Sequence, residues 1–277
     1  MKIRTEVITS RNNPLVKWAS SLSDKKGRAE HKSFIAEGEK LTFEALKSGL
    51  SVTHIFVLEE RFQELSEKLS QFLSDDRWSE CEIILLSEGA FAKISTEKAP
   101  QGVISVIKYL DFFANLDIIY KEDFFIFDGE RALALYSLRD PGNLGAVIRS
   151  AVAFGVEHIV LSSDSADVYN PKTIRAAMGS LFKVKVSYVA DFSSFIRSAR
   201  GCGRRVFAAE LTDSATSLSD LSLAREDIFI IGNEGHGISC EISQECTGSV
   251  YIPISDKIES LNASVAAAVL MWEQNNL

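Results

Sequence analysis

The passage Ile252–Val269, IPISDKIESLNASVAAAV, indicates the fold more clearly than any other part of the chain. It begins at the end of a β-branched run, VYIPI, and continues through an acidic loop and a polar cluster into an alanine-rich helix. Ser260 is a natural N-cap for that helix, and the small side chains of Ala263, Ala266 and Ala267 suit close helix packing. A strand, a polar loop and a packed helix in this order are typical of the ligand-binding edge of a parallel α/β sheet.

The rest of the C-terminal half repeats this strand-and-helix pattern. Strands are predicted at FFIFD, HIVLS, RVFAAEL, DIFIIG and VYIPI, and helices at 143–154, 171–178 and 260–274. Alternating elements of this kind predict an α/β fold with a mostly parallel sheet covered on both faces. The stretch Glu130–Arg139 separates FFIFD (124–128) from the first polar loop, so we interpret it as an insertion.

The first hundred residues predict a smaller α/β domain. Helices are expected from Asn13-Pro14, in EKLTFEALKSG, and at 61–73 and 88–94, and strands in KSFIAEG, VTHIFVL, EIILL and VISVIKY. The passage Asp111–Asp123 has no clean period. We therefore predict a first domain at 1–110, a linker at 111–123 and a second domain at 124–277.

Composition indicates a soluble globular protein. Of the 277 residues, 46% are hydrophobic and 25% are charged. No apolar run is long enough to span a bilayer and the N-terminus resembles no signal peptide, so we expect a cytoplasmic protein without a membrane partner. The four cysteines and four histidines are scattered without the spacing of metal ligands, so no metal is expected.

The charge distribution leaves room for a nucleic-acid partner despite a net charge of −8. Residues 1–32 hold eight basic and three acidic side chains, a net +5, so the remainder carries −13. A basic region on an acidic body can bind phosphates locally, although a solvated charged face explains the pattern equally well. The candidates for phosphate contact are Arg11, Lys17, Lys25, Lys26 and Arg28.

Two further loops that follow strands carry candidate functional residues. In RDPGNLGAVIRSAVAFG, Asn143 can cap a helix, and Arg149 lies among small residues that leave room for a ligand, although a surface salt bridge is its commoner role. In IIGNEGHGIS, a glycine-rich turn exposes backbone groups around Glu234. This turn lacks the Gly-Lys-Ser/Thr of a phosphate-binding loop and the order of a dinucleotide fingerprint.

Together the three loops resemble the three signature motifs of the SpoU/TrmH family, within the SPOUT class of S-adenosylmethionine-dependent RNA methyltransferases. NLGAVIRSA resembles the first motif, IGNEGHGIS the second and IPI…ESLNASVAAAV the third, and YNPKTIRAAMGSLFKVKV resembles an intermediate stretch. SRNNPLVKWASSLSDKKGRAEHKSFIAEGEKLTFEAL resembles the N-terminal substrate-binding domain of many members, which has a ribosomal-protein-like α/β fold. The resemblance implies a SPOUT-type sheet with a deep trefoil knot, a homodimer formed through the C-terminal domain, and methyl transfer from S-adenosylmethionine to a ribose 2′-hydroxyl in structured RNA.

The resemblance also implies the roles of individual residues. The active site would hold Asn143, Arg149, Glu234, Ser260 and Asn262, and the cofactor site would hold Gly232, Ile252 and Leu261. The family account makes Arg149 a general base, but a guanidinium seldom gives up its proton, so we prefer a clamp on a neighbouring phosphate. Asn143 would orient this arginine, and Glu234 would either orient it too or accept the hydroxyl proton through water.

Several alternatives stay open. A non-catalytic RNA-binding or ribosome-assembly factor could keep the fold, but the polar residues of all three motifs are present. A dehydrogenase is disfavoured because its early glycine fingerprint is missing. Base methylation and a tRNA target are possible in related branches, whereas the SLN of the third motif favours ribose and the extra N-terminal domain favours ribosomal RNA.

Overall fold

The computed structural model describes residues 1–73, 75–110 and 130–276, and both the predicted linker at 111–123 and the predicted strand at 124–128 lie outside them. The chain divides into two units. The first comprises residues 1–110 together with 169–182, and the second comprises residues 111–168 together with 183–277. The segment 169–182 therefore packs with the N-terminal unit, although its neighbours on both sides along the chain belong to the second unit.

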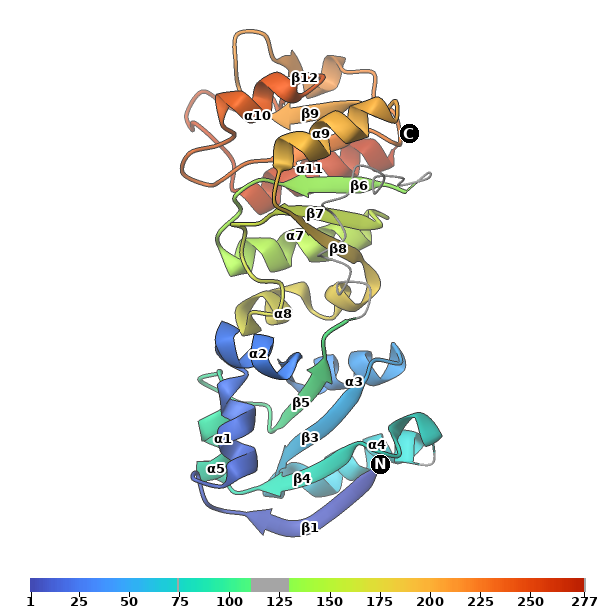
Figure 1. Ribbon diagram of the computed structural model, residues 1–277, viewed down its shortest axis with the longest axis vertical. Helices are drawn as coiled ribbons and strands as arrows, with labels where there is room; N and C mark the ends of the chain where they lie inside the picture. The colour runs from blue at the N-terminus through green and yellow to red at the C-terminus, as the bar shows by residue number, and fades with distance from the viewer. Residues whose placement is uncertain (74, 111–129, 277) are drawn as a thin grey trace. The chain divides into compact units, whose positions relative to one another are not determined.

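A mixed five-stranded sheet forms the centre of the first unit (Figure 1). Its strands are β1 (Lys2–Ile8), β2 (Ser33–Glu37), β3 (Val52–Leu58), β4 (Glu82–Leu86) and β5 (Val103–Lys108), in the order β1-β4-β3-β5-β2. β5 is antiparallel to both of its neighbours, and the other pairs are parallel. The sequence predicted four of these strands. It missed β1, an edge strand whose first five side chains are exposed and which therefore carries no buried apolar run.

Helices cover both faces of this sheet. They are α1 (Pro14–Ser21), α2 (Lys25–His31), α3 (Glu39–Lys47), α4 (Phe62–Leu73), α5 (Glu88–Ile94) and α8 (Pro171–Ala177), with short 3-10 turns at Glu59–Arg61, Asp76–Trp78 and Ser180–Lys183. α1 and α5 bury Val16 and Phe91 against Phe56 of β3, and each of these side chains is at most 2% exposed. In the 169–182 segment, the ring of Tyr169 stacks on Phe34 and Tyr109, with ring centroids 4.7 Å and 4.2 Å apart.

The second unit contains a seven-stranded sheet in which every pairing is parallel, as predicted. Its strands are β6 (Ala132–Leu135), β7 (His158–Ser162), β8 (Lys185–Val189), β9 (Val206–Ala209), β10 (Thr216–Ser217), β11 (Ile228–Ile231) and β12 (Gly248–Tyr251). The interpretation of Glu130–Arg139 as an insertion is wrong. All four residues of β6 are buried in the sheet, so ALAL is the strand that leads directly into the first polar loop.

Helices cover both faces of this sheet as well (Figure 1). α7 (Pro141–Ala153) packs against α11 (Ala263–Asn275) on one face, and α9 (Phe192–Gly201) and α10 (Cys240–Glu245) lie on the other, with a 3-10 turn at Leu218–Asp220. The core beneath α9 is apolar: Phe195 and Ile196 are 1% exposed or less and pack against strand residues such as Ile230. Within the described residues no helix is long and apolar enough to cross a bilayer.

The order of the strands places a topological switch in the middle of the sheet. It reads β10-β12-β9-β11-β6-β7-β8, so the chain proceeds outward from β6 through β7 to β8 and then crosses to the other side, to β9. In such sheets, ligands bind where the order reverses, beyond the carboxyl ends of the strands, and here that point lies between β6 and β11. After β12 the chain returns to the middle of the sheet, where α11 packs on α7 and β11, which is the return that the predicted trefoil knot requires.

Candidate active site

The first polar loop leads from β6 into α7 and presents Asn143 at the carboxyl end of the sheet. Asp140 caps the helix, because its carboxylate accepts a hydrogen bond from the Asn143 amide nitrogen at 2.8 Å, and Pro141 occupies the first turn. The prediction that Asn143 is the cap is therefore wrong by three residues. Since Asp140 performs that function, the side chain of Asn143 is available for contacts outside its own helix.

The second loop is a tight turn between Gly232 and Gly237, just beyond β11. The backbone groups of Asn233 and Gly237 exchange two hydrogen bonds of 3.0 Å and 2.9 Å, and Oδ1 of Asn233 accepts from the Gly235 amide at 2.8 Å. A Cβ at Gly232 would lie 2.5 Å from the carbonyl carbon of Gly237, so the turn requires glycine there. The turn carries Glu234 on its exposed part.

The third loop ends at Asn262, which caps α11. Its Oδ1 accepts hydrogen bonds from the amide nitrogen of Ser264 at 2.9 Å and from the Ser264 hydroxyl at 2.6 Å. The prediction that Ser260 is the cap is therefore wrong by two residues. Serine and asparagine cap helices about equally well, so residue type alone could not choose between them. Ser260 instead lies exposed on the loop that precedes the helix.

Hydrogen bonds join these three loops. Nδ2 of Asn262 donates to Oδ1 of Asn143 at 3.1 Å, and Nδ2 of Asn143 donates to Oε1 of Glu234 at 2.9 Å. The partners are 119 and 91 residues apart in sequence, so only the fold can bring them together. Asn143 follows β6 and Glu234 follows β11, the two strands on either side of the topological switch.

The chemistry of the end groups fixes the direction of this chain of bonds. The Glu234 carboxylate can only accept, so Asn143 must present its NH₂ group to it and its Oδ1 to Asn262. Oδ1 of Asn262 in turn accepts the hydrogen bond from the Ser264 amide at the start of α11, so Asn262 presents its NH₂ group to Asn143. The arrangement therefore holds a carboxylate in one position at an exposed edge, where a ligand from solvent can reach it.

Arg149 lies on α7, six residues beyond Asn143, and its side chain is exposed. Within the described residues its guanidinium forms no hydrogen bond or ion pair, and Glu234 and Asn143 bond to one another instead. The predicted orientation of Arg149 by Asn143 or Glu234 is therefore not seen within one chain. The guanidinium is free to pair with an external anion.

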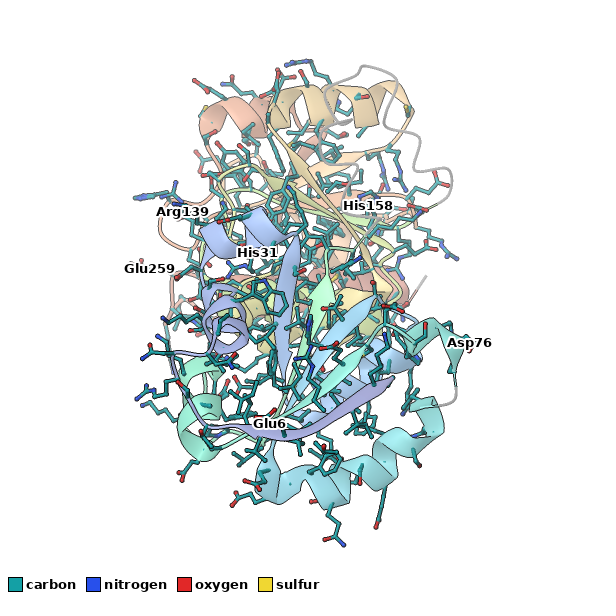
Figure 2. The ribbon with its side chains drawn as sticks, turned by 60° about the horizontal axis from the view of Figure 1, so that its bottom comes forward. Glu6, His31, Asp76, Arg139, His158 and Glu259 are labelled. Carbon is teal, nitrogen blue, oxygen red and sulfur yellow. The ribbon has the colours of Figure 1, made fainter. Side chains whose placement is uncertain are left out.

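A cavity of about 490 Å³ opens between the end of β9 and the passage that links β12 to α11. Two of the three predicted cofactor residues, Ile252 and Leu261, line it, and so does Ser260. Gly232 is not among its lining residues, and the tight turn accounts for the glycine. Figure 2 shows that Glu259, on the wall of this cavity, and Arg139, next to the first loop, lie at the same end of the strands, whereas His158 lies toward the other end.

The lining of this cavity fits S-adenosylmethionine. Leu211, Ile254 and Ile258 offer apolar walls for an adenine ring, and they are among the exposed large hydrophobic side chains of the chain. The lining holds three carboxylates and, among the described residues, neither lysine nor arginine. A cavity with this balance suits a ligand whose sulfonium and ammonium groups give it a net positive charge. In the described parts of the chain no group of three or more His, Cys, Asp or Glu side chains is arranged to hold a metal ion.

The basic N-terminal residues divide into exposed and buried ones. Arg11 and Lys17 line a polar groove of about 720 Å³ in the first unit, together with Lys93 of α5, and Lys25 and Lys26 are exposed at the start of α2. Arg28 is 2% exposed. Its guanidinium donates to the carbonyl oxygens of Leu22 and Ser23 at 3.0 Å and 2.6 Å, so it supports the loop between α1 and α2 and is withdrawn from the predicted phosphate contacts.

Sequence reasoning missed residues that hold the loops in place. Ser137, after β6, adopts a left-handed conformation with φ of 54°. Its carbonyl oxygen accepts from Nδ2 of Asn233 at 2.7 Å, its amide donates to Oγ of Ser162 at 2.7 Å, and its hydroxyl donates to Asp164 at 2.5 Å. Burial alone would raise the pKa of Asp164, but hydrogen bonds from Ser137, Ser162 and Arg139 together lower it. A non-glycine residue at positive φ beside a site is strained backbone that its surroundings must hold.

Comparison with known proteins agrees with this geometry. The model of the SpoU rRNA Methylase family matches residues 130–272, and that of the MRM3-like substrate binding domain matches residues 13–105. The chain is 30% identical over 265 residues to the 23S rRNA (guanosine(2553)-2′-O)-methyltransferase RlmP of Bacillus subtilis, covering 96% of this chain and 97% of that one. It is 27% identical over 274 residues to the 23S rRNA (uridine(2479)-2′-O)-methyltransferase of Streptomyces viridochromogenes, covering 96% and 90%. An AdoMet-bound rRNA methyltransferase from Sinorhizobium meliloti superposes with a TM-score of 0.79 at 27% identity, covering 99% and 98% of the two chains.

The parallel sheet, its switch point and the three joined loops define a methyltransferase of the SPOUT fold class. Within that class, the chain belongs to the SpoU rRNA methylase family. The match begins at Glu130 and therefore includes β6, the strand that leads into the first motif.

Proposed function

We propose that this protein transfers a methyl group from S-adenosylmethionine to a ribose 2′-hydroxyl in ribosomal RNA, as a cytoplasmic enzyme. The observation that carries the proposal is the chain of hydrogen bonds from Asn262 through Asn143 to Glu234, next to a cavity of the right size and charge. The names of the relatives in Bacillus and Streptomyces support 23S ribosomal RNA, rather than tRNA, as the substrate class.

The reaction needs alignment and removal of a proton. A bond forms between the ribose oxygen and the methyl carbon while the bond from carbon to sulfur breaks, and the hydroxyl proton must leave. S-adenosylmethionine supplies the methyl group on a positively charged sulfonium. Glu234 is the carboxylate at this site that can accept the proton, directly or through a water molecule, and Asn143 and Asn262 fix its position.

Arg149 and Ser260 complete the proposed catalytic group. The exposed guanidinium of Arg149 would bind a phosphate next to the target ribose and lower the cost of the negative charge that forms on the oxygen. The hydroxyl of Ser260, on the wall of the cavity, would orient the ribose or the cofactor. The cofactor itself would be held by Ile252 and Leu261.

Methyl transfer to defined RNA tests this proposal. The purified protein is incubated with radiolabelled S-adenosylmethionine and 23S rRNA from a strain that lacks the gene, and the modified nucleotide is identified by mass spectrometry. We expect one 2′-O-methylated nucleotide, and its loss with Glu234→Gln, which keeps the shape and removes the basic carboxylate. Methylation of a base, or undiminished transfer by Glu234→Gln, would contradict the assignment.

We propose that the polar groove of the first unit binds the RNA backbone. Arg11 lines it from the loop before α1, Lys17 from α1 and Lys93 from α5. The other described lining residues are polar or acidic, so they offer hydroxyl groups and no aromatic surface for base stacking. Lys17→Ala and Lys93→Ala should each weaken RNA binding and reduce the dependence of log K on log salt by about 1. Lys68→Ala is the control, because Lys68 is paired with acidic side chains elsewhere. Equal effects of all three variants would contradict this placement.

We propose that the protein is a homodimer formed through α7 and α11. Val265 and Trp272 of α11 are 48% and 52% exposed, and they line an apolar groove that also includes Ser150 of α7. An exposed tryptophan among small apolar residues is typical of a protein interface. Sedimentation should show a dimer that Trp272→Glu converts to monomer, whereas Leu211→Glu, which lies outside this groove, should not. A monomeric wild-type protein would contradict the proposal.

A further inference from the structure

We infer that Glu210 makes the cofactor cavity selective for the positively charged S-adenosylmethionine over its neutral product S-adenosylhomocysteine. The inference rests on the proposed function, because it concerns the same cavity. Glu210 directly follows β9 and lines the cavity opposite the passage that links β12 to α11. Glu210 lies outside the three motifs.

The position of the Glu210 carboxylate is fixed by the protein. Its Oε1 accepts hydrogen bonds from the hydroxyls of Ser243 in α10 and of Ser249 in β12, the latter at 2.7 Å. The backbone nitrogen of Glu210 also donates to the carbonyl oxygen of Val250 at 3.0 Å. Two hydroxyl groups thus hold this half-buried carboxylate beside the cavity that Glu210 lines, so its charge acts on a ligand bound there.

The charge of the cavity distinguishes substrate from product. Glu210 is joined by Asp256 and Glu259, which are exposed and therefore more strongly screened by solvent, and no cationic side chain is among the described lining residues. S-adenosylmethionine carries a sulfonium, and methyl transfer converts it to a neutral thioether, which removes one positive charge from the ligand. The cavity therefore attracts S-adenosylmethionine more strongly than S-adenosylhomocysteine. Methyl transfer thus converts a tightly bound ligand into a more weakly bound one.

Calorimetric binding of three ligands tests the inference without an activity assay. The probes are S-adenosylmethionine, S-adenosylhomocysteine and sinefungin, an analogue with a charged amine in place of the methylsulfonium. We expect the wild-type protein to bind both cationic ligands more tightly than S-adenosylhomocysteine. Glu210→Gln, which can still accept from both serines, should reduce that preference roughly fivefold, as expected for loss of one partly screened charge. Glu210→Asp, which keeps the charge, should retain most of it.

Matched controls separate the possible outcomes. Glu241→Gln removes an exposed carboxylate in α10 that does not line the cavity, and it should leave the preference unchanged. An unchanged preference in Glu210→Gln, or equal weakening of all three ligands, would overturn the inference and leave the proposed function standing. If the wild-type protein binds none of the ligands and transfers no methyl group to rRNA, the proposed function itself fails.

Discussion

Burial of His158 should make the stability of the C-terminal unit fall as the pH falls below neutrality. His158 begins β7 and is 7% exposed. Its Nε2 lies 2.8 Å from the hydroxyl of Ser187, and its Nδ1 lies 3.7 Å from a carboxylate oxygen of Glu130. Burial lowers the pKa of His158 to about 4, and the attraction of Glu130, which would raise it, does not compensate.

The sign and size of the effect follow from linkage. An unfolded histidine titrates near 6.5, so between that pKa and about 4 the unfolded chain binds a proton that the folded chain does not. Stability is therefore complete above the unfolded pKa and is lost as the pH falls toward the folded one. From about pH 7.5 to about pH 5, this group alone should lower the free energy of unfolding by about 2 kcal/mol.

Urea denaturation of the full chain at these two pH values measures the effect. His158→Gln should reduce the loss of stability on acidification by about 2 kcal/mol relative to the wild type, because glutamine does not titrate. His236→Gln is the control, because His236 is exposed on the glycine turn. This variant should lose as much unfolding free energy on acidification as the wild type. If His158→Gln and the wild type lose the same stability on acidification, the reasoning is refuted.

Three further predictions follow from the site and its supports. Gly232→Ala should lower the free energy of unfolding by about 1–3 kcal/mol, and with it the melting temperature, because its Cβ would overlap Gly237. It should also weaken cofactor binding. An unaltered melting temperature would contradict the requirement for glycine. Asn143→Ala breaks the contact with Glu234, so it should slow methyl transfer about 100-fold in single-turnover assays. It should leave cofactor affinity unchanged in calorimetry. A change confined to cofactor affinity would argue against a role of Asn143 in positioning Glu234. Arg28→Ala should lower the free energy of unfolding by about 2 kcal/mol, because the buried guanidinium donates hydrogen bonds to two carbonyl groups. Full stability together with weakened RNA binding would show instead that Arg28 contacts phosphate.

Sequence patterns predicted many, but not all, of the elements in which burial and periodicity coincide. HIVLS is a fully buried central strand, and the sequence predicted it at its observed bounds. β6 was missed because the sequence analysis assigned the strand to the more apolar run FFIFD, and ALAL is a run of only four residues without a β-branched or aromatic side chain. α9 was missed although Phe192, Phe195, Ile196 and Ala199 follow helical spacing and are buried, a signal that was present in the sequence.

The candidate site was predictable in its members but not in its connections. The motifs named Asn143, Glu234 and Asn262, yet no pattern could show that they bond to one another, because that depends on the order of strands in the sheet. Arg28 was misjudged because a charge in sequence carries no information on whether its side chain is exposed. No sequence pattern marked Glu210 as a candidate site residue, because its importance comes from a cavity whose other wall lies forty residues further along the chain.

The segment Tyr169–Phe182 determines how this protein can be divided. It leaves the second unit after Val168, packs its apolar residues with the first unit, and returns at Lys183. Leu181 and Ile174 are each 1% exposed there, so a fragment that begins near Phe124 would keep the segment but lose the surface that covers it. Cutting the chain once therefore cannot separate it into two fragments that each contain one complete unit. A deletion of the first unit would test its role in RNA binding only if Ile174 and Leu181 were also replaced by polar residues.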